Sequence, residues 1–507
     1  MKLKNKLVLA ALAILLAAAA YFAARSRPAG PAQPPDSPAA KVYNGILDME
    51  PPDAALAPGK ILEVHSIRLA RQVYSSILAY DDSFNITGDL ASGWEISPDG
   101  RAYRFTLKEN VFFHDGARMT VDDVVASLKR LGEPDSTQKG LWSFVKKVER
   151  IDEKSFVIKL KSRFPPFLDF LTTVYAAVSK AGVKSASGAV IGTGPYQIAV
   201  WEPKKVVRLK RNSLYYGVRP KIDEINFYIP SAPAGIGGLA KKFVLHDLGW
   251  YNPPVDRSEA GNYTEMDIPS LQVSLLCLNI SKPPFSNPAF RKAFVRAFDK
   301  KEFIGQISPG ARMASGYLPL GLLGHNPEIP VNYFDGGAGA ATLAKYRRKI
   351  AVVAGINTKS DHAREGAYFR DTYAKFGLDV SVVYLPDDEY LKTFLNGSYD
   401  VIKISNEADF PDAYGMLAYF TGSHPMTFLR GGDKKIDEML VKAMGHLDRG
   451  ARAATYGEVD RYIVDNHYAI PLYYNTNRRR FHNSLKGIRP SLMGEHLFSI
   501  AKLDIHD

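Results

Sequence analysis

The segment from Asn406 to Tyr414, NEADFPDAY, places three acids and two aromatic rings around one proline. A carboxylate beside rings that exclude water is suited to holding a cation or an amine, because charge-assisted hydrogen bonds are about twice as strong as neutral ones. Burying such a carboxylate alone is costly, so a site of this kind selects a ligand of opposite charge. The alternative is a solvated loop in which one Asp caps the next helix, and this segment alone leaves both interpretations open.

Strand and helix patterns alternate in the stretch that leads to these acids. The expected elements are a strand at 349–355, a helix from His362 to Phe376 closed by Gly377, a strand at 378–385, a helix at 387–397 and a strand at 399–405. This order and these lengths predict a parallel sheet with right-handed crossovers. In such sheets ligands bind beyond the carboxyl ends of the strands. Because NEADFPDAY directly follows the third strand, its acids are expected near a ligand.

Two further segments show ordinary strand and helix signals. Alternation predicts strands at Tyr103–Leu107 and Val111–Phe113, followed by a helix capped by Thr120. Asn287 can cap a second helix, which Pro288 begins. The apolar stripe of that helix consists of Phe290, Ala293, Phe294, Ala297 and Phe298. Packing on one side explains both helices without a functional role.

Catalytic motifs are missing from the sequence. It contains no H-E-x-x-H, no G-x-S-x-G, no phosphate loop ending in G-K-[ST] and no cysteine pair for zinc. Gly192–Tyr196, GTGPY, lacks the rest of a dinucleotide fingerprint and is typical of a tight turn. Cys277, the single cysteine, lies in an apolar strand and is expected to be a small buried residue rather than a nucleophile. We therefore expect no enzyme, no catalytic residue, no metal site and no cofactor.

Chain length, composition and net charge limit the classes of protein to which this sequence can belong. The 507 residues, 46% hydrophobic and 23% charged, are typical of a folded chain with two or three domains and room for a cleft between them. Of the net charge of +12, five positive charges precede the first acid, which leaves +7 for the rest of the chain. This charge is spread along the sequence, whereas a nucleic-acid surface requires a clustered basic face. Nucleic-acid binding is therefore not expected.

The N-terminal residues are typical of an export segment. Three lysines precede the uncharged run Leu7–Ala24, which has the composition of a secretory h-region and is also long enough to be retained as a membrane anchor. We assign residues 1–24 to a signal peptide or N-terminal anchor and residues 25–41 to a Pro-rich linker. The protein is expected in the periplasm, secreted or tethered to the outer face of the cytoplasmic membrane.

Several segments, in order, resemble the extracytoplasmic solute-binding proteins of ABC importers, in the oligopeptide- and dipeptide-binding family (family 5). The matching segments are LASGWEISPDGRAYRFTLKENVFFHDGARMTVDDVVASLKR, GTGPYQIAVWEP with RNSLYYGVRPKIDEINF, LNISKPPFSNPAFRKAFVRAFDKKEFI, EADFPDAY, and IDEMLVKA leading to YIVDNHYAIPLYY. Together they cover the chain from about Tyr43 to the C-terminus. The first two are the most specific to the family.

The resemblance implies an α/β fold, the two-lobed periplasmic-binding-protein fold of the large class, with two chain crossings between the lobes. Lobe 1 would comprise residues 42–272 plus 468–507, with an extra subdomain at about 62–185. Lobe 2 would comprise residues 273–467. Ligand would be enclosed by hinge closure of the lobes, and the membrane permease would recognise the closed form.

In peptide-binding members of this family, an acid of the "AD-aromatic" motif pairs with the free α-amino group of the ligand, and the matching residue is Asp409. Phe410 and Tyr414 are weaker candidates for pocket walls. Trp250 and Tyr251, in DLGWYNPP near the end of lobe 1, are further candidates, although aromatic residues are more often core. The sequence departs from the family at FVLHDLGW, and no residue is assigned to a ligand carboxylate.

The resemblance therefore implies a monomeric solute-binding component of an ABC importer that captures short peptides and delivers them to the permease subunits in the cytoplasmic membrane. One alternative keeps the fold but binds a metal chelate, haem, a sugar or an opine. Another is a membrane-anchored interaction or sensor protein built on the same scaffold. An exported hydrolase has no positive support in the sequence.

Overall fold

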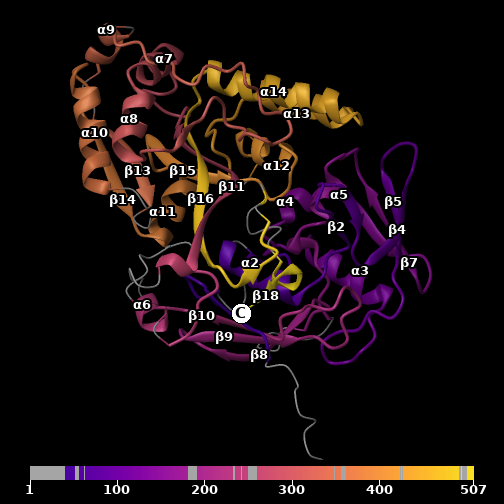
Figure 1. Ribbon diagram of the computed structural model, residues 1–507. Helices are drawn as coiled ribbons and strands as arrows, with labels where there is room; N and C mark the ends of the chain where they lie inside the picture. Colours follow the sequence, from indigo (N-terminus) through magenta and orange to yellow (C-terminus); the bar gives the residue numbers. More distant parts are fainter. Residues whose placement is uncertain are drawn as a thin grey trace, which may run out of the picture. The chain divides into compact units, whose positions relative to one another are not determined.

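The computed structural model describes most of the chain from Ala40 to His506 (Figure 1). The described residues are 40–51, 56–61, 63–180, 191–231, 235–240, 242–248, 260–337, 339–346, 349–355, 361–422, 424, 426–489, 491, 493 and 499–506. Apart from Ala40, all of them belong to one compact unit, Lys41–Asp507. The expected export segment and almost all of the expected linker lie outside the described residues.

The first sheet has four strands, in the order β1 (Val42–Ile46), β10 (Glu224–Tyr228), β9 (Val206–Arg211) and β8 (Tyr196–Glu202). β1 and β10 are parallel, and the other pairs are antiparallel. Helix α2 (Val64–Val73) contacts this sheet through β8. Its N-cap is Glu63, whose carboxylate accepts hydrogen bonds from two backbone N–H groups of the first turn.

A second sheet, β4 (Ala91–Ile96), β5 (Ala102–Leu107), β7 (Ser155–Leu160) and β6 (Val145–Arg150), is antiparallel throughout. Thr120 caps α3 (Val121–Arg130) in a capping box with Asp123, as its position predicts. The short elements of this region are β2 (Leu78–Tyr80), β3 (Ile86–Gly88), α4 (Lys139–Trp142), α5 (Phe167–Phe170) and the 3-10 turn η2 (Val174–Ala176). The expected strand Val111–Phe113 is wrong: Phe112 forms only an isolated bridge with Arg118, because a tight turn at Gly116 leaves no room for a ladder.

The largest sheet has six strands, β12 (Arg312–Met313), β16 (Ala469–His482), β11 (Tyr263–Leu278), β15 (Val401–Glu407), β13 (Ile350–Gly355) and β14 (Val380–Leu385), in that order. β14, β13 and β15 are mutually parallel. α10 (His362–Ala374) and α11 (Asp387–Asn396) provide the crossovers. The parallel unit expected from residues 349–405 is therefore confirmed.

Helices cover both faces of this sheet (Figure 1). In β11, Leu276 and Leu278 pack on the side of α7 (Pro288–Arg296), α8 (Lys300–Ile307) and α10. Leu275 and Cys277 belong to the main core, with residues of α13 (Lys434–Gly445) and α14 (Arg449–Asp465). This alternation is the two-residue period of a strand that is buried on both faces. The remaining described elements are α6 (Gly235–Ala240), η3 (Ala260–Asn262), α9 (Ala340–Ala344), α12 (Tyr414–Leu417), η4 (Ala418–Phe420), β17 (Leu485–Lys486), η6 (Ile500–Lys502) and β18 (Asp504–Ile505).

The long strands β11 and β16 connect the six-stranded sheet to the first sheet. Their antiparallel pairing is interrupted between Pro269 and Val273. Beyond this break, only the C-terminal half of β11 also pairs with β15. At the other end, Phe481 of β16 bridges to Asp247, which bridges in turn to Gly45 of β1. The segment 269–273 is therefore the natural position for a bend between the two parts.

The third parallel strand is longer than the sequence indicates. β15 continues through Asn406 and Glu407, which pair with Val273 and Gln272 of β11. NEADFPDAY therefore begins inside the strand rather than after it, because a neighbouring strand that is distant in sequence supplies ladder partners. Within the described part of the chain, no helix has the length and apolar character that crossing a membrane requires.

Candidate functional site

Asp409 lies two residues beyond the C-terminal end of β15, at the edge where the parallel strands end. The backbone N–H of Ala408 donates to the carbonyl oxygen of Leu271, 3.1 Å away, which ties this turn to the bend in β11. The Tyr175 hydroxyl, from η2, donates to Oδ1 of Asp409 at 2.8 Å. The half-buried carboxylate is thus held between two parts of the chain that are 234 positions apart in sequence.

A second acid, Glu407, is the last residue of β15, two positions before Asp409. Its Oε1 accepts a hydrogen bond of 3.1 Å from the Ser270 hydroxyl, in the bend of β11. Burial raises the pKa of Asp409 to about 6, against the opposing effect of the Tyr175 hydrogen bond. Burial also raises the pKa of Glu407 to about 7, against the Ser270 hydrogen bond, and the charge of Asp409 raises it further. The charge of Asp409 is thus close enough to disfavour ionisation of Glu407.

Neither acid has a cationic partner in the described part of the chain. Among the residues that the structure describes, no lysine, arginine or histidine forms an ion pair with Glu407 or Asp409. The hydroxyls of Tyr175 and Tyr419 do not supply a counter-charge either. Burial and the charge of Asp409 raise the pKa of both, so these groups stay neutral. A ligand that brings a positive charge would stabilise both ionised carboxylates. This turn is therefore equipped to bind an amine or another cation.

The third acid of NEADFPDAY has a structural role. Asp412 is 2% exposed and accepts hydrogen bonds from Nε of Arg452 at 3.1 Å and from the Tyr456 hydroxyl at 2.7 Å. Both partners belong to α14. Asp412 therefore fixes the loop against α14, as a buried ion pair rather than as the solvated helix cap of the alternative interpretation. The ligand-binding interpretation of the segment stays a prediction.

The two aromatic residues of the segment lie in different surroundings. Phe410 is 1% exposed and belongs to the main core. Tyr414 packs edge-on against Phe164 and Phe144, with ring centroids 5.0 and 5.7 Å away. Tyr414 also lines a cavity of about 600 Å³, together with Lys161 and other residues of the second sheet region and with residues of α13. The ligand contacts expected for both aromatic residues stay predictions.

Some residues near the site were expected from the sequence, and others were not. Trp250 and Tyr251 lie outside the described residues. Sequence reasoning missed Tyr175 and Ser270, which approach the acids only through the tertiary structure. Glu407 stood within the quoted segment, and its place two positions before Asp409, at the end of a parallel strand, was the one signal that could have identified it. No group of three or more His, Cys, Asp or Glu side chains suited to a metal occurs in the described ranges.

Comparison with known proteins gives the family of this chain. Residues 85–428 match the family model described as "Bacterial extracellular solute-binding proteins, family 5 Middle". A probable D,D-dipeptide-binding periplasmic protein of Escherichia coli K12 is 24% identical over 449 residues, which cover 82% of this chain and 85% of that protein. The dipeptide-binding protein of the same organism is 24% identical over 463 residues, covering 82% and 86%.

Solved structures show the same fold. The dipeptide-binding protein from Pseudoalteromonas sp. SM9913 in complex with Met-Leu superposes with a TM-score of 0.79 at 18% identity, covering 92% of this chain and 100% of that one. The periplasmic binding protein DppA from Helicobacter pylori, in complex with the peptide STSA, gives 0.77 at 19% identity, covering 92% and 98%. The two-lobed α/β fold expected from the sequence is thus confirmed, and the chain belongs to the bacterial extracellular solute-binding proteins of family 5.

Proposed function

We propose that this protein captures short peptides outside the cytoplasmic membrane for an ABC importer, with Asp409 receiving the α-amino group of the peptide. The observation that carries the proposal is the pair of carboxylates, Glu407 and Asp409, at the end of β15 without a cationic partner among the described residues. The names of the relatives support the same ligand class, since both proteins of Escherichia coli are named for dipeptides.

Capture follows from the charge of the turn. The ammonium group of the ligand would donate a hydrogen bond to Asp409. It would also favour the ionised carboxylate, because a nearby positive charge lowers the pKa of a carboxyl group. Glu407 would contribute further negative electrostatic potential at the position of the ammonium group. Tyr175, which already donates to Asp409, would orient the carboxylate. The bend at 269–273 lies directly beside this turn, so ligand contacts and closure of the two parts would be coupled.

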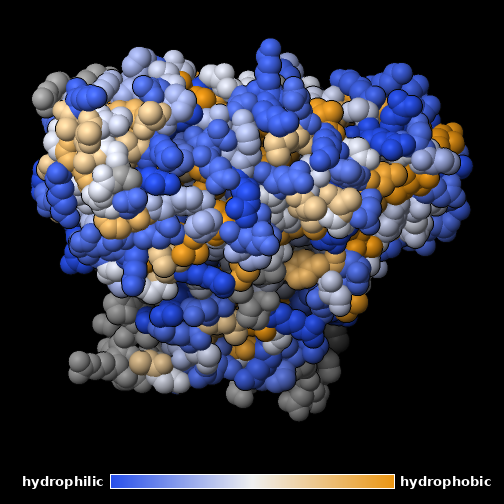
Figure 2. Space-filling view, turned by 90° about the horizontal axis from the view of Figure 1, so that it is seen from above, coloured by the Kyte–Doolittle hydropathy of each residue, from blue (hydrophilic) through white to orange (hydrophobic). Residues whose placement is uncertain are grey.

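The remaining assignments follow from the family role. The protein would act as a monomer that delivers its ligand to permease subunits, in the periplasm, either free or tethered by residues 1–24. The face seen in Figure 2 is mostly hydrophilic, with hydrophobic side chains in small separate groups, which agrees with a monomer. The proposal assigns no catalytic residue. Phe410 and Tyr414 would lie behind or beside the ligand, and Trp250 and Tyr251 remain candidate contacts.

Thermal-shift and calorimetric titration of the purified full chain test the proposal. Free dipeptides and tripeptides are compared with the same peptides acetylated at the N-terminus. A ligand that binds only the folded state stabilises it by about 2.7 kcal/mol at a hundredfold excess over its dissociation constant. We expect free peptides to raise the melting temperature and acetylated peptides to have a much smaller effect.

Asp409→Asn is the decisive variant, because it keeps the shape of the side chain and removes its charge. It should abolish the difference between free and acetylated peptides, whereas Asp437→Asn, at an acid that lines the neighbouring cavity, should preserve that difference. Equal binding of free and acetylated peptides by the unaltered chain would refute the role of Asp409. A metal, haem or carbohydrate recovered with the purified protein would instead favour a non-peptide ligand on the same fold.

A further inference from the structure

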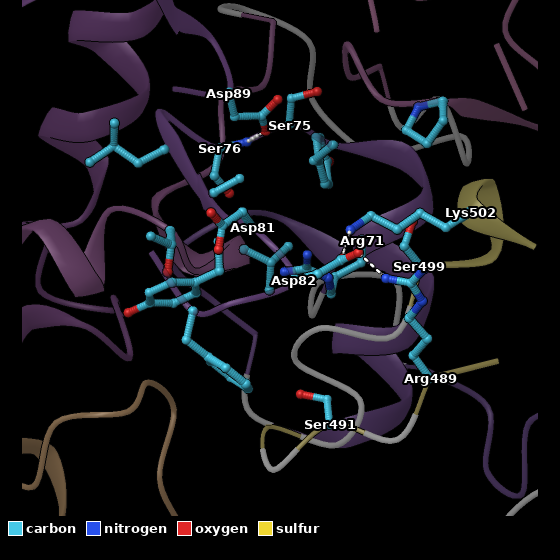
Figure 3. Close-up of a pocket in the computed structure, with 18 of the residues that line it drawn as sticks. Arg71, Ser75, Ser76, Asp81, Asp82, Asp89, Arg489, Ser491, Ser499 and Lys502 are labelled. Carbon is cyan, nitrogen blue, oxygen red and sulfur yellow. Dashed lines mark hydrogen bonds and ion pairs between the residues drawn. The ribbon is translucent and has the colours of Figure 1, made fainter. Parts of the chain in front are cut away.

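A separate cavity of about 420 Å³ lies beside the first sheet, and Figure 3 shows its lining. Its walls come from the end of α2, from β2 and the loop that follows it, and from the turn at 172–174. Near the C-terminus its described lining residues are Gly487, Arg489, Ser491, Ser499, Lys502 and Leu503. None of its lining residues lies between 273 and 467, so it is distinct from the turn that carries Asp409. Its volume is within the range of about 300 to 1,000 Å³ that is usual for small-molecule sites.

Arg71, in the last turn of α2, is the unusual side chain of this cavity. Its Nε is buried and has no hydrogen-bond partner. The guanidinium forms no ion pair with any residue that the structure describes. A cation in the last turn interacts favourably with the helix dipole, but that interaction does not satisfy a buried N–H group. Burial lowers the pKa of Arg71, with opposing effects from Asp89 and Tyr215, so its charge is held at a cost.

The acids of the cavity are already satisfied. Asp82 pairs with both Arg489 and Lys502. Asp89 accepts hydrogen bonds from the backbone N–H of Ser76 at 2.9 Å and from a tyrosine hydroxyl. Figure 3 shows these contacts as dashed lines between the labelled residues that it draws.

Asp81 is also satisfied, since it accepts hydrogen bonds from Ser83 and Asn85 in its own turn. The negative charge of Asp89 acts on Arg71 from nearby, although the two side chains form no ion pair. What stays unsatisfied in the lining is the buried Nε–H donor of Arg71, which has no acceptor among the described residues.

We propose that this cavity is a second ligand site, which binds a small organic carboxylate with Arg71 as its counter-ion. A guanidinium offers two parallel N–H donors that match the two oxygens of a carboxylate. The hydroxyls of Ser75, Ser499 and Tyr215 line the same cavity and can donate to the ligand. The lining holds three acids and three basic side chains and so carries no excess positive charge, which favours a monoanionic carboxylate over a dianionic phosphate. The proposal is independent of peptide capture at Asp409.

Ligand-observed NMR and thermal shift with the full chain test this site, using acetate and benzoate at constant ionic strength. Benzamide, which is neutral and has the shape of benzoate, is the matched ligand control. Arg71→Gln should weaken benzoate binding roughly tenfold or more, because the charge-assisted pair is lost. Arg104→Gln, at an exposed arginine of β5, should leave the affinity unchanged. Asp409→Asn should also retain benzoate binding, which separates this site from the peptide turn.

The folded state of the variant provides a second readout. Because the Nε of Arg71 has no hydrogen-bond partner and its guanidinium forms no ion pair among the described residues, Arg71→Gln without ligand should melt no lower than the unaltered chain. A large loss of stability would mean that Arg71 makes a structural interaction, and the site would then be rejected. Equal benzoate affinity in Arg71→Gln, no binding of either carboxylate by the unaltered chain, or equal binding of benzamide would each overturn the proposal. Phosphate that displaces benzoate at lower concentration would overturn the choice of carboxylates.

Discussion

Two buried acids of this protein, Asp247 and Asp409, differ in what surrounds them. Asp247 is fully buried between Arg68 of α2 and Arg479 of β16, and the Tyr43 hydroxyl donates to it at 3.0 Å. Asp409 is half-buried and accepts a hydrogen bond from a tyrosine, with no cation beside it among the described residues. In the first cluster the carboxylate has two cationic partners, and it ties α2, β1 and β16 together. The second lacks the charge that a ligand would supply.

The two acids therefore differ in whether the described residues around them supply a cation. A buried carboxylate that the protein neutralises holds the fold together, and one that it leaves without a cation is a candidate for binding. Asp412, only three residues from Asp409, belongs to the first kind, because Arg452 neutralises it. Proximity in the sequence is thus a poor guide to which role an acid has.

The largest effect is expected at the structural cluster. Asp247→Asn would leave two buried arginines without their counter-charge, and breaking a buried pair in this way costs about 3 to 5 kcal/mol. Urea unfolding followed by circular dichroism measures the loss. Asp99→Asn, at an exposed acid, is the control and should change stability far less than Asp247→Asn does. A small effect at Asp247 would mean that the cluster does not hold these elements together.

Asp409→Asn should show the opposite pattern. We expect it to weaken peptide binding by about 1.5 to 3 kcal/mol, the range for hydrogen bonds to charged groups, while the ligand-free protein is no less stable than before. Calorimetric titration gives the first quantity and urea unfolding the second. If ligand-free Asp409→Asn were destabilised as strongly as Asp247→Asn, the contrast between the two acids would fail.

The pH dependence of stability sharpens the contrast further. Because folding raises the pKa of Asp409 from 3.8 to about 6, the folded state binds more protons than the unfolded state between these values. The contribution of Asp409 to stability therefore falls as pH rises through this window, by about 1 to 3 kcal/mol, and is constant above it. Relative to Asp409→Asn, the ligand-free chain should thus lose stability between pH 4 and pH 6. Thermal unfolding of both proteins across this range measures the difference, and parallel curves would contradict it.

Peptide affinity should have the opposite slope. An ammonium ligand requires the ionised carboxylate, so binding should strengthen as pH rises through about 6, where Asp409 titrates. The same titration with Asp409→Asn should lose most of this dependence. The remainder would report Glu407, whose pKa is about 7.

The smallest effect is expected for Tyr175→Phe, which removes one hydroxyl. Loss of its hydrogen bond should cost about 0.5 to 1.5 kcal/mol in peptide binding. Since that bond lowers the pKa of Asp409, the midpoint of the pH profile should move upward in the variant. A binding profile at several pH values tests this role, and an unchanged midpoint with an unchanged affinity would show that Tyr175 does not position the carboxylate.

Much of the fold follows from local patterns. The parallel unit from β13 to β15 and the caps of α3 and α7 are where the sequence predicts them, because strand alternation and helix capping depend on residues a few positions apart. Val111–Phe113 did not form the expected strand, and β15 extends to Glu407, because strand length depends on partners elsewhere in the chain. Lobe boundaries and the ligand contacts of the aromatic residues stay predictions.

The candidate site, like the fold, could be predicted only in part from the sequence. The sequence alone determined that acids follow a parallel strand, and so placed Asp409 at the edge of a sheet where ligands bind. Only the tertiary structure decided which acids keep an unbalanced charge. The partners of Asp247 are 179 and 232 positions away in the chain, and that of Asp409 is 234 positions away. Electrostatic balance depends on distance in space, which local sequence patterns do not encode.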